Sequence, residues 1–323
     1  MQIRFLYSSI VLAFCIASVA YAQPTITNNN QGSAAGAENE QKIEVGYLEN
    51  GEPDTTNMPP LGFYERTTIP EKRRPVPYTY VREADVLWSK IIWRKIDLRQ
   101  KINLPLYYPT VRMRDRKSIT QALYDAIQNK EIYAYDPLPS FSSPGDEFVK
   151  RMTLEDVHKQ MYTEGGVIVM PNIQTGKIDT FVVESEMRFK DVRELLLKEE
   201  WFFDSKRSLL EVRVLGICPI LETVNLNGSG GDMELSMAFW VYYPEARKVL
   251  THIAAYNNRN DAQSISFDDL IFKRRFDSYI IRESNEYENR AVNEYKKGGI
   301  PNMLESERIH YDIFNTEHDL WEF

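Results

Sequence analysis

The first long hydrophobic pattern of the chain runs from Asp85 to Leu104 and reads DVLWSKIIWRKIDLRQKINL. At 100° per residue, its apolar residues cover nearly half the circumference of a helix, and two cations, Lys95 and Arg99, lie inside that arc. Proline disfavours helical continuation, so the pattern predicts a helix from Glu83 to just before Pro105. The apolar arc consists of Ala84, Leu87, Trp88, Ile91, Ile92, Leu98 and Ile102.

Two further apolar side chains, Val86 and Trp93, would project from the far side of this helix. A second apolar face is either buried within the same domain or covered by another protein chain. Our hypothesis is that Trp93 contacts a neighbouring subunit, where a buried aromatic side chain can contribute a few kcal/mol. Lys95 and Arg99 repel each other weakly, and each needs a partner if it is buried. We expect intramolecular partners, from the acid-rich C-terminal part.

Other segments also show a helical pattern. Ser118 to Lys130 places its apolar residues on one face, and Thr153 to Met161 begins with a capping residue followed by Asp156 at the capping-box position. Weaker helical patterns cover three further ranges: Asp191 to Glu199, Phe267 to Tyr287 and Met303 to Phe314.

Between these segments the chain changes its period to that of β-strands. The runs GVIVM, IDTFVVE, LLEVRVLGICPI, LSMAFWVYY and KVLTHIAAY are β-branched and aromatic, and turn residues such as NLNGSGGD separate them. Helices followed by strands and again by helices favour an α+β fold over a doubly wound sheet. The predicted architecture is a mainly antiparallel sheet packed with helices, with an extended N-terminal arm and a C-terminal helix.

The N-terminal part divides into three segments. Residues 1–22 carry a lone cation, an apolar run of about 15 residues and small residues before Gln23, which predicts a cleaved signal peptide and not a membrane span. Residues 23–58 are poor in large apolar side chains and predict a disordered spacer. Residues 59–80 contain five prolines and predict an extended arm. The remaining residues, 81–323, form the α+β domain, as one body or as two closely packed lobes.

The arm carries side chains that could bind a protein surface. Our hypothesis is that Phe63 and Tyr64, with Leu61 and Ile69, bury against a groove on another protomer or on a partner protein. Lys72, Arg73 and Arg74 would then meet an acidic rim. The alternative, an arm that folds back on its own domain, is equally consistent with the sequence.

The charge of the chain argues against nucleic acid as a partner. The formal net charge is −8, and loss of Arg4 with the signal peptide leaves −9. The basic run Lys273, Arg274 and Arg275 follows Asp268 and Asp269 on a predicted helix, with Asp269 and Lys273 in the favourable i to i+4 order. These three cations form either a solvated, self-paired face or a contact with an acidic partner. No hydrophobic segment after residue 22 approaches spanning length, so we expect no direct membrane insertion.

The sequence predicts no catalytic constellation, no metal site and no cofactor. The chain has four histidines, and His310 and His318 are too far apart along a helix for paired zinc ligands. Ser229 lies among glycines but lacks the spacing of a nucleophile elbow. Cys218 lies in an apolar run, so we expect a buried thiol. The many carboxylates and 19 tyrosines leave a carbohydrate-active or carbohydrate-binding protein as an alternative.

Several long motifs resemble the GldN/PorN family of type IX secretion and gliding-motility proteins. They are DVLWSKIIWRKIDLRQKINLPLYYP, EEWFFDSKRSLLEVRVLGICPI, FWVYYPEARKVL, FDDLIFKRRFDSYIIRESNEY and EHDLWEF, and they occur in the same order as in that family. The resemblance covers the chain from about Pro59 to its C-terminus, and residues 23–58 contribute nothing to it.

The resemblance implies a non-enzymatic component of a ring in the periplasm, peripherally associated with the outer membrane. In that family the protein binds a lipoprotein of the GldK/PorK type, contacts the periplasmic domain of a GldM/PorM protein and self-associates in the ring. A secreted carbohydrate-binding or carbohydrate-active protein is the alternative class. The two classes differ in native mass, since a ring component belongs to a very large assembly and a secreted enzyme does not.

Overall fold

A computed structural model gives the fold of the chain for residues 73–113, 116–137, 147–163, 166–171, 178–183, 186–224, 233–260 and 262–321. The predicted signal peptide, the spacer and most of the arm, including Phe63 and Tyr64, lie outside these described residues, as does Ser229. Among the described helices, none combines the length and the apolar character that a membrane crossing requires.

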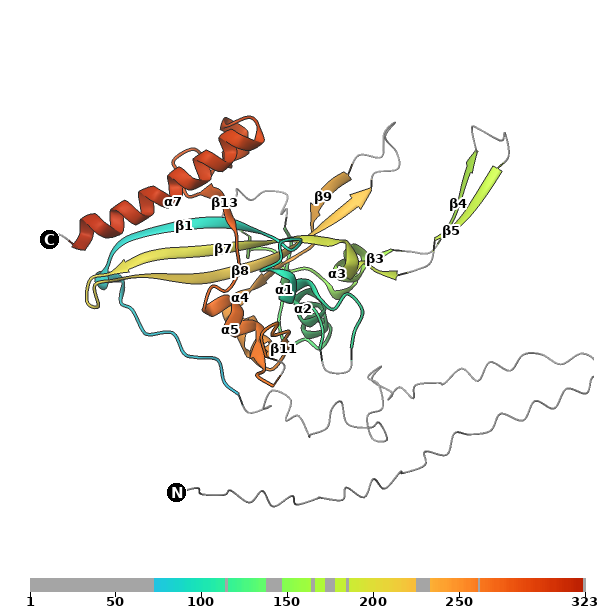
Figure 1. Cartoon of the computed structure of the whole chain (residues 1–323), viewed down its shortest axis with the longest axis horizontal. Helices are drawn as coiled ribbons and strands as arrows, with labels where there is room; N and C mark the ends of the chain where they lie inside the picture. The colour runs from blue at the N-terminus through green and yellow to red at the C-terminus, as the bar shows by residue number, and fades with distance from the viewer. Residues whose placement is uncertain are drawn as a thin grey trace, which may run out of the picture. The chain divides into compact units, whose positions relative to one another are not determined.

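The centre of the described fold is one antiparallel sheet of seven strands (Figure 1). Three long strands form its middle: β1 (Val86–Asp97), β7 (Val192–Asp204) and β8 (Leu209–Val224). Six strands follow the order β13-β1-β7-β8-β10-β2, and β9 also pairs with β8. The shorter strands are β2 (Ala134–Tyr135), β9 (Met233–Met237), β10 (Trp240–Tyr242) and β13 (Tyr279–Glu283). The α+β class and the antiparallel sheet are therefore confirmed.

The prediction of a helix between Glu83 and Pro105 is wrong, because Val86–Asp97 is strand β1. It pairs with β7 from Val86 to Asp97 and with β13 from Ile92 to Lys95. Both faces of this strand are covered, so apolar residues occur at neighbouring positions such as Ile92 and Trp93 and imitate a helical stripe. A short 3₁₀ turn (Glu83–Asp85) precedes the strand, and α1 (Leu104–Tyr107) follows it.

Three other sequence-based assignments are corrected by the structure. Asp191 to Glu199 was predicted as helix, but from Val192 it is the first half of β7. The run from Lys248 to Tyr256 was predicted as strand, but its first four residues are the end of α4 (Tyr243–Thr251), whose first turn carries Pro244, and only Ala254–Ala255 are strand. The predicted helix from Phe267 to Tyr287 contains only α5 (Phe267–Phe272), after which the chain turns into β13.

Two of the correctly predicted helices begin at capping residues that are recognisable in the sequence. Helix α2 (Ile119–Gln128) begins at a reciprocal capping box between Ser118 and Gln121, and α3 (Leu154–Met161) begins where the Thr153 side chain accepts a hydrogen bond from the Asp156 backbone. The C-terminal helix is confirmed as α7 (Gly299–Trp321) and is longer than predicted.

Small elements complete the described fold. Strands β4 (Gly166–Pro171) and β5 (Ile178–Val183) correspond to the predicted runs GVIVM and IDTFVVE, and they pair antiparallel with each other. The other pairs are β3 (Tyr162–Thr163) with β6 (Glu186–Met187) and β11 (Ala254–Ala255) with β12 (Ile265–Ser266). A 3₁₀ turn (Arg188–Asp191) and α6 (Val292–Tyr295) are the remaining helical pieces.

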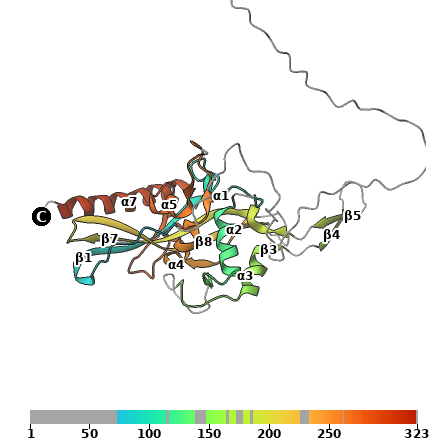
Figure 2. The same cartoon turned by 90° about the horizontal axis from the view of Figure 1, so that it is seen from below.

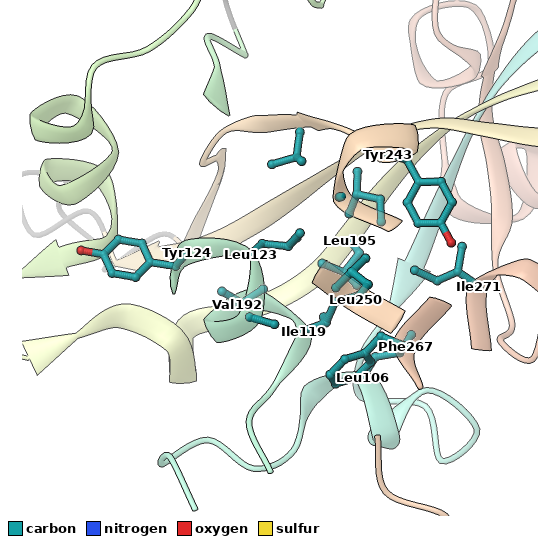
Figure 3. Packing of buried hydrophobic residues seen from close by; sticks show 14 of the residues in the cluster. Leu106, Ile119, Leu123, Tyr124, Val192, Leu195, Tyr243, Leu250, Phe267 and Ile271 are labelled. Carbon is teal, nitrogen blue, oxygen red and sulfur yellow. The ribbon is translucent and has the colours of Figure 1, made fainter. Parts of the chain in front are cut away.

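The main core lies where α2, α4 and α5 cover the sheet (Figures 1 and 3). Side chains of these helices, such as Leu123, Leu250 and Phe267, pack against Leu195 of β7, and all four are buried. Burying a side chain of this size contributes about 1.5–3 kcal/mol, so this layer is the principal source of stability for the sheet.

Helix α7 packs against the opposite side of the sheet, along β13 (Figures 1 and 2). Its Ile309 and Ile313 are buried in a cluster with Ile92 of β1 and Ile280 of β13. The Ile280 backbone N–H donates to Ser306 Oγ over 2.9 Å, which satisfies a donor at the edge of the sheet. One face of α7 therefore covers an edge strand.

Candidate interaction surface

The described end of the arm, residues 73–80, lies on its own domain. Arg247 of α4 donates to the Val76 carbonyl over 2.7 Å, and Arg213 of β8 donates to the Thr79 carbonyl over 2.6 Å. For residues 73–80 the arm thus folds back, which was the alternative to docking on another chain. The hypothesis for Phe63 and Tyr64 is not affected, because those residues precede the described part.

Tyr78 is the aromatic anchor of this segment. Its ring lies 4.2 Å from the Arg247 guanidinium, and its centroid is 6.0 Å from that of Phe272 at the end of α5. Burial raises the pKa of the Tyr78 phenol above its usual value, which agrees with a ring that is packed between elements. The arm is therefore attached to the fold by a cation and an aromatic ring as well as by backbone hydrogen bonds.

A buried ion pair joins the two helices beneath the arm. Arg247 of α4 donates from Nε to Asp268 Oδ1 over 2.9 Å, and both side chains are about 5% exposed. The Tyr243 hydroxyl donates to the same oxygen over 2.7 Å. Burial and the charge of Asp268 raise the pKa of Tyr243 well above its usual value, so the hydroxyl stays protonated and remains a donor.

The two predicted basic runs meet at Asp269. Asp269 is part of the capping box that starts α5, where it interacts with Ser266, and it also binds Arg73 of the arm. Lys273 Nζ lies 3.4 Å from its other oxygen, so the predicted i to i+4 pair with Lys273 is confirmed. Burial alone would raise the pKa of Asp269, but the Ser266 hydrogen bonds and the charges of Arg73 and Lys273 outweigh it and hold the pKa below its usual value.

Arg274 leaves this surface, although it is the middle residue of the second basic run. Its backbone takes a positive φ of 50° just after α5 and directs its side chain toward Glu199 of β7. The Arg274 guanidinium donates to both carboxylate oxygens of Glu199, over 2.8 and 3.2 Å, and the Glu199 side chain is fully buried. The run therefore divides: Arg274 belongs to the fold, whereas Lys273 and Arg275 are exposed.

We call Arg73, Arg74, Lys273 and Arg275, together with Tyr78 and Phe272, the arm-side surface. Arg73 of the arm and Lys273, which follows α5, meet at Asp269 although they are about 200 residues apart in the sequence. Arg74, Lys273 and Arg275 are exposed, while Arg73 is partly covered. Exposed guanidinium and ammonium groups of this kind can bind carboxylates of a partner protein.

Comparison with known proteins identifies the family. The sequence profile described as "Gliding motility associated protein GldN" matches residues 81–322, which is most of the chain. The chain belongs to the GldN family. A search of curated proteins found no match. As a GldN-family member, the protein is a periplasmic component of the gliding-motility and type IX secretion machinery.

The remaining predicted site residue, Trp93, lies inside this GldN-family fold. Only 1% of it is exposed, and its Nε1 donates to Glu147 Oε1 over 2.7 Å. Glu147 also binds Lys198 of β7, whose ammonium lies 5.3 Å from the Trp93 ring. The two-faced helix that motivated a subunit contact through Trp93 is a strand, so that hypothesis has lost its structural basis.

The two cations of the predicted helix do have intramolecular partners. Lys95 pairs with Glu194 of β7 over 2.7 Å, and Arg99 pairs with Asp97 over 2.8 Å. An intramolecular partner was predicted correctly, but neither carboxylate belongs to the C-terminal part, because β1 lies in the middle of the sheet beside β7.

The structure also locates residues that bear on other chemistry. Cys218 is buried and free, as predicted, and burial raises the pKa of its thiol. Within the described ranges, no three His, Cys, Asp or Glu side chains are grouped so as to hold a metal ion.

The sequence pattern gave no indication that Arg247, Arg213, Tyr78 and Phe272 lie at this surface. The signal that could have revealed Tyr78 is its place among prolines in PVPYTY, because an aromatic residue in a proline-rich arm needs a surface to contact.

Proposed function

We propose that this GldN-family protein is a non-enzymatic scaffold of the periplasmic secretion ring. It binds a GldK/PorK-like outer-membrane lipoprotein and a GldM/PorM-like periplasmic domain, and it self-associates in the ring. Peripheral association with the outer membrane follows from the lipoprotein partner, and residues 1–22 act as a cleaved export signal. Family membership favours this proposal over a secreted carbohydrate-active protein.

The observation that carries the partner-binding part of the proposal is the arm-side surface. In a chain with a net charge of −8, the arm exposes Arg74, and the segment that follows α5 exposes Lys273 and Arg275. Asp269 cannot neutralise all of them, because it pairs with Arg73 and Lys273 and leaves Arg74 and Arg275 for a partner. The surface therefore fits an acidic region of a partner protein.

The test is a triple substitution, Arg74→Ala, Lys273→Ala and Arg275→Ala, followed by pull-down of the lipoprotein partner at low and moderate salt. Arg274 is left intact because its loss would leave Glu199 buried without its cation. We expect binding to weaken at least tenfold and to lose most of its salt dependence. A matched control replaces three exposed lysines elsewhere, Lys101, Lys159 and Lys297. Equal binding of the two triple variants would refute the role of this surface.

Native mass analysis of envelope extracts tests the scaffold itself. A ring component should migrate with a very large assembly, and N-terminal sequencing of that species should begin at Gln23. A small, freely soluble species that carries no partner would contradict the proposal.

A further inference from the structure

Helix α7 has a second apolar face, opposite the face that covers the sheet. Its inward face is formed by Glu305, Ser306, Ile309 and Ile313, which are all at most 8% exposed. On the outward face, five large apolar side chains are between 54% and 75% exposed: Ile300, Met303, Leu304, Tyr311 and Phe314. A surface helix normally has one apolar stripe, so the outward stripe has no function in the packing of the described fold.

The spacing of the outward stripe is that of a coiled-coil seam. Ile300, Leu304, Glu307, Tyr311 and Phe314 alternate steps of four and three residues, which are the d and a positions of a heptad repeat. In the same register the inward residues occupy positions b, c and f, which point away from the seam. The stripe extends over about 21 Å at 1.5 Å per residue, long enough to pair with another helix over two heptads.

The charge along α7 indicates what kind of helix fits. The helix contains five acidic residues and one cation, Arg308. Arg308 donates to Glu305 over 2.6 Å and also binds Asp312, so its charge is already paired within the helix. Glu307, in the seam, and Asp319 are exposed, and neither forms an ion pair with any described residue. The seam is therefore apolar with unneutralised negative charge.

A cavity beside the seam offers room for inserted side chains. It has a volume of about 1210 Å³, and Met303, Glu307 and His310 of α7 form part of its lining. Its lining also includes Trp93 and Trp240 of the sheet, together with charged side chains such as Arg94 and Glu147. A helix lying on this side of the seam could therefore place side chains into a cavity of mixed apolar and charged lining.

We propose that the outward seam of α7 binds an amphipathic helix of another protein that has apolar a and d positions and Lys or Arg at the flanking positions. A second copy of α7 fits less well, because it would place acidic residues against Glu307 and Asp319, and like charges across a helix pair repel. This proposal does not depend on the arm-side surface or on which partner binds there. The proposal for the arm-side surface and the proposal for the seam can therefore fail separately.

The test uses two synthetic 21-residue helices with leucine at every a and d position, one with lysine and one with glutamate at e and g. Binding to the purified full chain is measured by fluorescence anisotropy at low and moderate salt. We expect the lysine peptide to bind at least tenfold more tightly than the glutamate peptide, with the difference shrinking as salt increases. Equal binding of the two peptides would overturn the proposal.

Substitutions on the seam provide the second arm of the test. Leu304→Ser with Phe314→Ser should weaken binding of the lysine peptide at least tenfold, whereas Tyr287→Ser, which alters an equally exposed residue outside α7, should leave it unchanged. Glu307→Lys should make the glutamate peptide bind more tightly than the lysine peptide. Because this is a separate single substitution, it tests the seam even if the double variant folds poorly. A double variant that folds and binds like the wild type would contradict a seam.

Two outcomes would assign the seam to a different occupant. Sedimentation that shows a wild-type dimer and a monomeric double variant would make a second copy the occupant. A photoreactive residue at position 314 that couples to residues 23–72 of the same chain would make that segment the occupant. Either result would overturn the proposal of a basic partner helix.

Discussion

The arm-side surface and the outward seam of α7 both face solvent, but they differ in how many contacts their side chains make with the rest of the chain. At the arm-side surface, Asp269 and Arg247 hold the arm in place, and the aromatic ring of Tyr78 is packed. On α7, Leu304 and Phe314 contact solvent while the opposite face fills the core. Substitutions beneath the arm should therefore affect stability, whereas substitutions on the seam should affect binding alone.

The largest effect is expected from Arg247→Ala. This change leaves Asp268 buried without its cation and removes the donor to the Val76 carbonyl, which should reduce the free energy of unfolding by about 3–5 kcal/mol. Denaturant unfolding measures it. Arg275→Ala, an exposed cation nearby, serves as the control and should change stability by less than about 0.5 kcal/mol. Similar losses in both variants would mean that the arm-side surface is held together by something other than this pair.

The two faces of α7 can be compared by a matched pair of substitutions on one helix. Ile309→Ala removes a side chain from the core and should cost about 2–4 kcal/mol. Leu304→Ala, on the outward face, should cost less than about 0.5 kcal/mol in the isolated protein. Thermal or urea unfolding distinguishes them, and a large loss for Leu304→Ala would show that the seam is covered by its own chain.

Removal of the arm should have a smaller effect than either core substitution. A protein that begins at Val81 loses the Arg73–Asp269 pair, the two hydrogen bonds from Arg247 and Arg213 and the packing of Tyr78, for a cost of about 1–2 kcal/mol. We expect a folded monomer with two-state unfolding, and the arm then contributes mainly to assembly. Complete unfolding of the truncated protein would instead make the arm part of the core.

The smallest effect is expected from His310 of α7, whose protonation makes the stability of the protein depend on pH. Burial, followed by the charges of Arg94 and Arg274, lowers the pKa of His310 below its usual value of about 6.5. The folded state therefore takes up this proton less readily than the unfolded state. The stability that His310 contributes is complete above the unfolded pKa and is lost as pH falls toward the folded pKa.

Unfolding measured between pH 7.5 and 5 should accordingly show a slightly shallower loss of stability in His310→Gln than in the wild type. Carboxylates with lowered pKa values, such as Asp269, titrate at lower pH and contribute equally to both proteins. Identical pH profiles would indicate that His310 is solvated in the folded state.

The sequence by itself determined the elements whose signals are local. Ser118 with Gln121 and Thr153 with Asp156 start their helices through contacts three residues apart, and the β-branched runs of β4 and β5 pair with each other as neighbouring strands of the chain. The family could also be identified from the sequence, because long mixed motifs survive in order along the chain. The basic residues of the arm-side surface were visible as two separate runs, although nothing in the sequence placed them together.

Only the tertiary structure decided the state of the segments that are buried on both faces. Val86–Asp97 has a helix-like apolar pattern, but its pairing with β7, about 100 residues away, makes it a strand. The same long-range contacts bury Trp93, direct Arg274 to Glu199 and join Arg73 to Asp269. They also turn one face of α7 inward and leave the other as a seam. The physical reason is that hydrogen-bond ladders and ion pairs between residues far apart in the sequence stabilise these conformations. A local sequence pattern carries no information about which distant residue becomes the contact partner in the folded protein.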